Sequence, residues 1–169
     1  MAITSAFTYS CSNAAVGGIS KLYIGNASEL TATYISGVVT AMAYASGKKF
    51  YEIGFEDDGC TFTEAIEVTN NKVLYKPEYK VKIGSRTPTA KLWIDTLQGC
   101  DRYMLVHIER PDPAVKWITG FTATQGLRLL SGTSQTGGTM AEDNMIELTF
   151  GHPTGVQYPC STFTGTLTL

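Results

Sequence analysis

The stretch Glu78–Gly84 reads EYKVKIG, and it decides the fold class. Its apolar residues Tyr79, Val81 and Ile83 alternate with two lysines. Because successive side chains of a strand point to opposite faces of a sheet, this period of two predicts a strand with one buried and one solvated face.

The same alternation recurs along most of the chain, and Gly, Asn, Asp, Ser and Pro clusters separate the segments. It continues into the C-terminal TFTGTLTL, which predicts a last strand paired into a sheet. The other predicted strands are Lys21–Ile24, Val38–Tyr44, Lys49–Phe55, Phe62–Val68, Tyr103–Ile108, Trp117–Thr119, Leu127–Leu130 and Met145–Phe150.

One segment, TPTAKLWIDTLQG at 87–99, breaks this period and predicts the single substantial helix. Thr87 can cap its N-terminus, Pro88 suits the first helical position and Gly99 can end it. A second, short helical turn is expected near NASEL at 26–30. The apolar stripe of the main helix comprises Ala90, Trp93, Ile94 and Leu97.

With 169 residues, no linker and no internal repeat, the chain is expected to form one domain. Many strands and one helix predict a mainly β fold, a β-sandwich or barrel with one flanking helix and a long hairpin loop. The N-terminal arm is expected at about 1–18 and the extended loop at about 131–144. The loop begins SGTSQTGGTM and lies between two predicted strands.

Composition argues against several classes of function. A net charge of −2 supplies no basic field for sequence-specific nucleic-acid binding. No run of about 18 apolar residues occurs and the start lacks a signal-peptide pattern, so a soluble chain made in a cytoplasm is expected, with no membrane partner. The four cysteines, all far apart in sequence, are expected to be reduced and at least half-buried: Cys11, Cys60, Cys100 and Cys160.

No catalytic triad, metal-ligand spacing or phosphate-binding loop is recognisable, so no enzyme activity, metal or cofactor is expected. His107 lies within a predicted strand and His152 in a Gly-Pro turn. Carboxylates gather at Glu52, Glu56, Asp57 and Asp58 around one predicted turn. Two interpretations of them stay open: a solvated hairpin tip, or a charged surface that faces DNA without gripping it.

The order of segments over nearly the whole chain resembles that of the tail tube proteins of long-tailed bacteriophages. An opening glycine-led strand, VGGISKLYIGNASELT, is followed by a hairpin pair that contains EIGFEDDGCTFTEAIEVTNNKVLYKPEYKVKIG. The helix TPTAKLWIDTLQG comes next, then the strands YMLVHIERPDPAVKWITGFTATQGLRLLSG and the returning strand AEDNMIELTFGHP. The cysteines and the Pro-Asp-Pro at 111–113 depart from what is expected of this family.

This resemblance implies a virion structural protein that self-assembles into rings of six copies, with a continuous β-barrel as the inner wall. Stacked rings would form a conduit through which DNA passes without specific binding. Other partners would be the tape measure and terminator proteins, and assembly in the bacterial cytoplasm would place the chain in the virion tail. The acidic residues Glu52, Glu56, Asp57 and Asp58 would face the lumen.

The polar arm would reach the next ring and become ordered on assembly. A mobile surface loop is the other interpretation of this arm. Two other functions also stay open: another virion subunit, such as a neck, terminator or head-decoration protein, or a binding module with an aromatic platform. The candidate residues for the contact between rings are Gly132, Thr133, Thr136, Thr139, Met140, Glu142 and Asp143.

Overall fold

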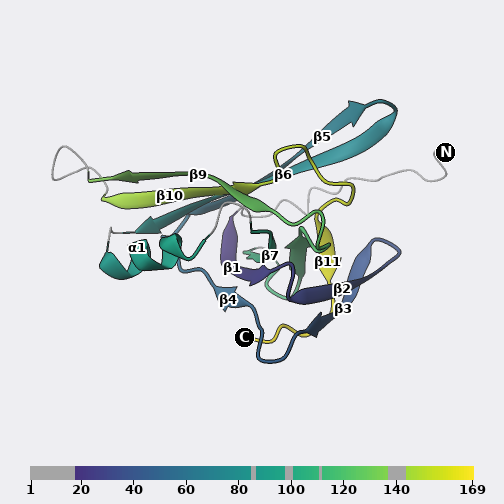
Figure 1. The fold of residues 1–169 in the computed structure, drawn as a ribbon, viewed down its shortest axis with the longest axis horizontal. Coiled ribbons are helices and arrows are strands. Elements are labelled where there is room, and N and C mark those ends of the chain that lie inside the picture. Colours follow the sequence, from purple (N-terminus) through teal and green to yellow (C-terminus); the bar gives the residue numbers. More distant parts are fainter. Residues whose placement is uncertain (1–17, 85–86, 98–100, 111, 137–143) are drawn as a thin grey trace.

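The computed structural model describes residues 18–84, 87–97, 101–110, 112–136 and 144–169. Figure 1 shows an elongated molecule in which two layers of strands pack together and a short helix lies at one end. The elements are β1 (Ile19–Asn26), β2 (Leu30–Ile35), β3 (Val38–Tyr44), β4 (Tyr51–Glu52), β5 (Cys60–Thr69), β6 (Lys72–Gly84), α1 (Pro88–Asp95), β7 (Tyr103–Glu109), β8 (Lys116–Thr119), β9 (Arg128–Gln135), β10 (Met145–Gly151) and β11 (Ser161–Phe163).

The strands form two sheets, and the fold is mainly β and sandwich-like. The larger sheet has seven strands in the order β2-β3-β11-β8-β7-β1-β4, and the smaller has four in the order β5-β6-β10-β9. All pairings within the named strands are antiparallel except that of β11 with β3. Neither sheet closes into a barrel, so the sandwich alternative of the prediction is confirmed.

The inner core fills the space between the two sheets. Tyr79 and Val81 of β6 are fully buried in it, as the alternation of EYKVKIG predicts. From the larger sheet, Leu22 and Leu105 contribute from the central strands β1 and β7. The burial of these two layers against each other is the main source of stability, since apolar burial contributes about 25 cal/mol per Å2.

An outer core lies on the opposite face of the larger sheet. Tyr23 of β1 and Met104 of β7 alternate with the inner-core residues and point into it. Leu30 at one end of the sheet and Phe50, next to β4 at the other end, belong to the same cluster. The sheet must therefore curve around this second core, and both faces of its central strands are buried.

The helix forms where the sequence predicts it. The Ala90 N–H donates to Thr87 Oγ1 at 3.1 Å, which confirms Thr87 as the N-cap. Trp93 and Ile94 pack against the inner core. The helix ends earlier than predicted, with Thr96 as its C-cap, and the expected stop at Gly99 lies outside the described residues.

Two local predictions are wrong because tertiary pairing overrides local pattern. The expected helical turn at 26–30 is a tight turn in which the Glu29 N–H donates to the Asn26 carbonyl at 3.1 Å, and β2 then begins at Leu30. Of the predicted strand Lys49–Phe55, only Tyr51 and Glu52 pair with β1. The apolar Phe50 and Ile53 are buried all the same, each in a different core.

The expected loop at about 131–144 begins later in the chain than predicted. Strand β9 runs on to Gln135, and its residues pair with β10 as far as Gln135 opposite Met145. Gly and Ser in this stretch therefore form an edge strand, whose side chains are exposed. Residues 137–143 lie outside the described residues, as does the expected N-terminal arm up to residue 17.

The C-terminal strand is also shorter than predicted, because β11 ends at Phe163. The following segment still contacts the body. Leu167 packs on the outer core, and the Phe50 N–H donates to the Thr168 carbonyl at 2.9 Å. The Tyr44 hydroxyl donates to the Thr166 carbonyl at 3.2 Å and accepts from the Thr168 N–H at 3.0 Å.

Deletion of Thr166–Leu169 is expected to lower the free energy of unfolding by roughly 2 to 3 kcal/mol, from one partly buried leucine and these hydrogen bonds. Leu169 is 58% exposed, so Leu169→Ser serves as the matched control and should change stability by less than about 0.5 kcal/mol. Urea denaturation of both variants measures the difference. A truncated protein as stable as the full chain would show that the tail does not support the fold.

Candidate assembly surfaces

The described residues hold no group of three or more His, Cys, Asp or Glu side chains that could bind a metal ion. In the same part of the chain, no helix has the length and apolar character needed to cross a membrane. Smaller groups of polar side chains remain as candidate sites. The most buried of these groups joins the two sheets.

This group comprises Tyr79 of β6, His107 of β7 and Thr119 of β8. The Tyr79 hydroxyl lies 2.7 Å from His107 Nδ1 and 2.9 Å from Thr119 Oγ1. All three side chains are buried, and desolvation lowers the pKa of His107 to about 4. In the neutral tautomer that carries its proton on Nε2, which faces Glu109, His107 Nδ1 accepts a hydrogen bond from the Tyr79 hydroxyl, and these bonds tie the four-stranded sheet to the larger one.

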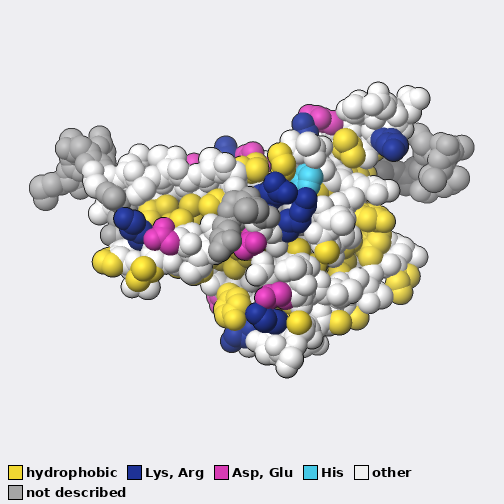
Figure 2. Space-filling view, viewed as in Figure 1, with side chains coloured by type: hydrophobic (Ala, Val, Ile, Leu, Met, Phe, Trp, Pro, Cys, Tyr) yellow, Lys and Arg dark blue, Asp and Glu magenta, His cyan; other side chains and the backbone are white. Residues whose placement is uncertain are grey.

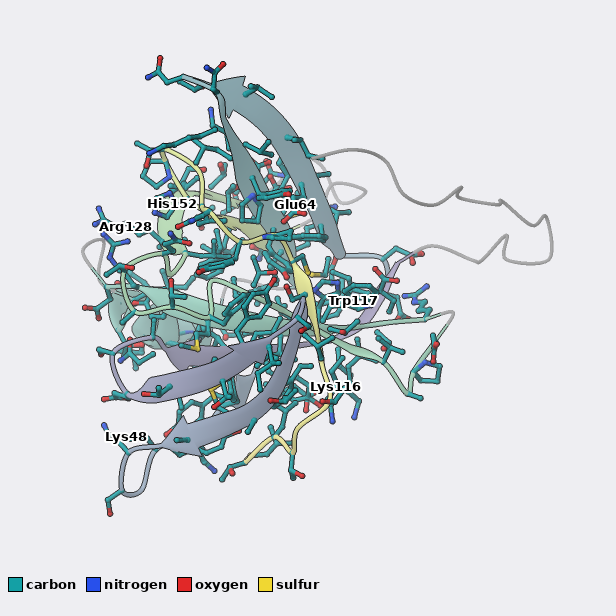
Figure 3. All side chains as sticks on the ribbon, turned by 90° about the vertical axis from the view of Figure 1, so that its right-hand side faces the viewer. Lys48, Glu64, Lys116, Trp117, Arg128 and His152 are labelled. Carbon is teal, nitrogen blue, oxygen red and sulfur yellow. The ribbon has the colours of Figure 1, made fainter. Side chains whose placement is uncertain are left out.

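Two cysteines and a glutamate lie near this group. The Cys160 N–H donates to a Glu64 carboxylate oxygen at 2.8 Å, about halfway along the β5–β6 hairpin, where Figure 3 labels Glu64. Burial raises the pKa of both Cys60 and Cys160 to about 12. Among the described residues neither forms a disulfide, both are at least half-buried as predicted, and their protonated thiols are poor nucleophiles. Cys11 and Cys100 lie outside the described residues.

The predicted acidic residues gather at one edge of the larger sheet. Glu52 lies in β4 opposite Tyr23, and the remaining three follow around the turn before β5. Asp58 forms an ion pair with Arg110 at 2.6 Å. Glu52, Asp57 and Asp58 line a shallow cavity of about 490 Å3 together with Arg110. None of these four carboxylates lies in a strand of the smaller sheet.

The outer face of the smaller sheet is polar. On β6 this face carries every second residue from Lys76 to Lys82, and all of these are charged. Lys76 pairs with Glu67 at 2.8 Å and Lys80 with Glu78 at 3.5 Å. Register places Glu147 of β10 directly opposite Lys82. Within the described residues, no strand pairs with the outer edge of β5 or of β9, so the sheet has two open edges.

Of the predicted contact residues, Gly132, Thr133 and Thr136 are exposed, the first two in β9. Thr139, Met140, Glu142 and Asp143 lie outside the described residues. The structure brings Gly132 and Thr133 to a groove of about 650 Å3 between α1 and the β9–β10 pair. We call it the helix groove. Its other lining residues include Lys91, Ile94, Asp95, Leu129, Ser134, Ile146 and Leu148.

At the other end of the molecule the β5–β6 hairpin projects beyond the larger sheet, as Figures 1 and 3 show. Three apolar side chains near its turn are exposed: Ile66 (67%), Val68 (71%) and Val73 (47%). Register places them on the face that carries Phe62 and Tyr79 further down the hairpin. We call this exposed end, residues 66–73, the hairpin tip.

Sequence reasoning missed the hairpin tip as a contact surface. The residues lie in or beside the predicted strand Phe62–Val68, whose alternation predicts one buried face. The available signal was length, since strands of 10 and 13 residues are longer than the usual five or six. A hairpin this long extends beyond the sheet that could cover it.

Comparison with known proteins identifies no relative. No family model, curated protein or solved structure matches this chain significantly.

Proposed function

We propose that the chain is a ring-forming subunit of a bacteriophage tail tube, or of a tube built in the same way. The observation that carries the proposal is the four-stranded sheet, β5-β6-β10-β9, which in the described part of the chain is open at both edges and packed on one face only. Open edges present unpaired N–H and C=O groups, and natural monomers usually cover, shorten or charge such edges. Pairing of an edge strand of one copy with an edge strand of the next satisfies these N–H and C=O groups.

Pairing of β5 of one copy with β9 of the next would continue the sheet around a ring, and six copies would close a barrel. Closure removes the open edges altogether. In this arrangement the inner cores of the subunits face outward from the barrel wall. The polar outer face of each smaller sheet then lines the channel.

The charges on this face suit a channel for DNA. Lys72, Lys76, Lys80, Lys82 and Arg128 stand against Glu67, Glu78 and Glu147, which gives five positive and three negative charges per copy. A wall on which carboxylates offset part of the positive charge binds the phosphate backbone less strongly than a purely basic wall would. Glu52, Asp57 and Asp58 lie off the strands of the wall in this arrangement, whereas Glu56 lies against β6, where its N–H donates to the Lys82 carbonyl at 3.1 Å.

Hexameric rings, and tubes at high concentration, are therefore expected from the purified protein. Light scattering gives the mass of the assembled species, and electron microscopy of negatively stained samples shows their shape. A chain that stays monomeric at every concentration and salt tested would overturn the proposal. In a virion the tube would also contact tape measure and terminator proteins, which immunolabelling of isolated tails would test through the position of this chain.

A further inference from the structure

Strand β9, at one open edge of the smaller sheet, begins with a cation that lacks an acidic partner. Among the described residues Arg128 forms no ion pair, and its buried Nε has no hydrogen-bond acceptor. Burial, and then Arg102 and Arg128, lower the pKa of His152, so two guanidinium groups lie near this point. Figure 2 shows Lys or Arg side chains gathered beside a histidine on this side of the molecule. A carboxylate from a second molecule is favoured here.

The pairings within the smaller sheet limit how β9 can meet β5 of the next copy in a ring. Each step from β5 to β6, β10 and β9 is antiparallel, so β9 runs opposite to β5. Rotation about the ring axis keeps strand directions, and β9 therefore pairs antiparallel with the next β5. Leu129 and Ile66 lie on the same face of the sheet, so they meet side by side when the sheet continues. The register must shift by an even number of residues, because an odd shift would turn the apolar face of one copy to the polar face of the next.

Barrel closure restricts the size of this shift. Within one copy Arg128 lies on the same rung as Thr63, through Gly151 and Glu78. With residues about 3.3 Å apart along a strand and strands about 4.8 Å apart, a shift of two residues per copy tilts the strands by about 19°. Shifts of four and six residues give about 35° and about 46°, and barrel strands tilt by roughly 35 to 45°. A shift of four or six residues is therefore compatible with closure.

Strand length decides the sense of the shift, and charge decides its size. A shift toward the hairpin tip lays the whole of β9 along β5, whereas the opposite shift sets Arg128 against Gly59, before β5 begins. Six residues toward the tip set Arg128 against Thr69, which carries no charge. Four residues set it against Glu67, a carboxylate.

We propose that β9 of one copy pairs with β5 of the next in the register that sets Arg128 opposite Glu67. The adjacent rung then joins Leu129 to Ile66, which is 67% exposed in the single chain. On the channel side, Glu67 accepts a hydrogen bond from Lys76 at 2.8 Å, and its remaining lone pairs accept from the guanidinium. The inference rests on the proposed ring and deepens it by naming the residues that join its copies.

The register also sets the width of the channel wall. With four strands from each of six copies, a tilt of about 35° gives a wall about 45 Å across between backbones. A shift of six residues would widen the same wall to about 53 Å. Cryo-electron microscopy of the rings separates these two widths.

Engineered cysteines test the register directly. The proposed register sets Thr133 opposite Thr63, and both side chains are exposed. Opposite residues of an antiparallel pair lie about 4.5 to 5.5 Å apart between Cα atoms, which a disulfide can span. Within one copy the two residues are three strand spacings apart, at least about 14 Å, so the bond can form only between copies. Thr133→Cys with Thr63→Cys is expected to give covalent oligomers up to the hexamer on a non-reducing gel after mild oxidation.

Neighbouring positions distinguish this register from the others. Thr133→Cys combined with Thr61→Cys reports a shift of two residues, and combined with Ala65→Cys a shift of six. Each combination should give roughly fivefold less covalent product, because diagonal neighbours are too far apart for a disulfide. Thr133→Cys alone controls for the native cysteines.

The outcomes separate the register from the ring. Stronger cross-linking through position 61 or 65, or a wall about 53 Å across, would overturn the register and leave the ring standing. Rings on micrographs in which none of the three pairs cross-links would overturn the contact between β5 and β9. A wild-type chain that stays monomeric under every condition would overturn the proposed function, and the register with it.

Charge exchange tests the ion pair. Arg128→Glu and Glu67→Arg should each weaken the contact between copies roughly fivefold, as attraction becomes repulsion, and the chain with both substitutions should regain rings. Lys80→Glu and Glu78→Arg are the matched controls, since they change charge on the same face but on β6, which is not an edge strand, and ring mass should stay unchanged. Sedimentation velocity measures ring mass. Single variants that assemble like the wild type, or a double variant that does not recover, would overturn the pairing of Arg128 with Glu67.

Discussion

Replacement of residues 136–144 by the two-residue turn Asn-Gly is expected to leave the subunit folded and to abolish tubes. The last rung of the β9–β10 ladder joins Gln135 to Met145, so a two-residue turn can connect these strands directly. The replacement removes most of the predicted contact residues, with Thr136, Thr139, Met140, Glu142 and Asp143 among them. Shortening a loop changes closure entropy by only about 1 kcal/mol.

The boundaries of this variant matter because β9 is longer than the sequence predicts. A deletion of Gly132–Thr139 would remove residues that pair with Leu148 and Ile146 of β10, and it would uncover the helix groove. Such a variant would confuse misfolding with lost assembly. The 136–144 replacement keeps every paired residue of β9 and removes only Asn144 from the lining of the groove, and thermal melting checks that the fold survives.

Ser36 and Gly37 provide the matched control, since they already form a tight turn between β2 and β3 with positive φ values of 50° and 88°. Ser36→Asn introduces the same Asn-Gly turn there and should leave tubes unchanged. If the shortened chain still forms tubes of normal length, the segment after β9 is an ordinary surface loop.

Alternation was sufficient to predict the centre of the fold. Tyr79 and Val81 are buried as expected, and β3, β5, β7, β8 and β10 follow predicted segments closely. The cap at Thr87 and the turn at 70–71 were also predictable, because their chemistry is local. Each of these features depends on contacts that the residue types themselves favour.

Other features depend on partners that the sequence does not reveal. Ser131–Gln135 contains no large apolar residue, yet β10 provides a ladder on which it becomes an edge strand. A helical turn was predicted at 26–30 and no strand at 31–35, but Leu30–Ile35 pairs with β3. The prediction of a strand at Lys49–Phe55 is wrong for the opposite reason. Phe50 and Ile53 are buried, but only two residues between them pair with β1.

The candidate surfaces divide in the same way. The acidic residues at 52 and 56–58 were identifiable as a group, and three of them do line one cavity. The helix groove could not be predicted, because it forms only where α1 meets β9 and β10 in space. The exposure of Val68 depends on where the larger sheet ends, and no local pattern encodes that.

Acid is expected to destabilise the subunit through His107. This side chain is 1% exposed, and burial lowers its pKa to about 4 from an ordinary value of 6.5. Between these two pH values the unfolded chain binds a proton that the folded chain does not, so stability falls as the pH falls. The difference of about 2.5 pKa units corresponds to about 3 kcal/mol, fully lost below pH 4.

The loss has a structural consequence, because a protonated Nδ1 can no longer accept a hydrogen bond from the Tyr79 hydroxyl. Glu109, with its carboxylate 3.6 Å from Nε2, is the one acidic group in contact with the ring among the described residues, and its side chain is 43% exposed. It offsets little of the burial cost. The tie between the two sheets then depends on the bond between Tyr79 and Thr119.

His107→Gln isolates this contribution, because glutamine retains an acceptor for Tyr79 but does not titrate. Urea denaturation at pH 7, 5.5 and 4.5 should show a smaller loss of stability in the variant, with carboxylate effects common to both chains. His152→Gln is the control: burial, then Arg102 and Arg128, lower the pKa of that half-exposed residue, and its removal should alter the pH dependence less. Equal pH dependence in wild type and His107→Gln would show that His107 accepts a proton in the folded chain without cost, which would contradict the lowered pKa.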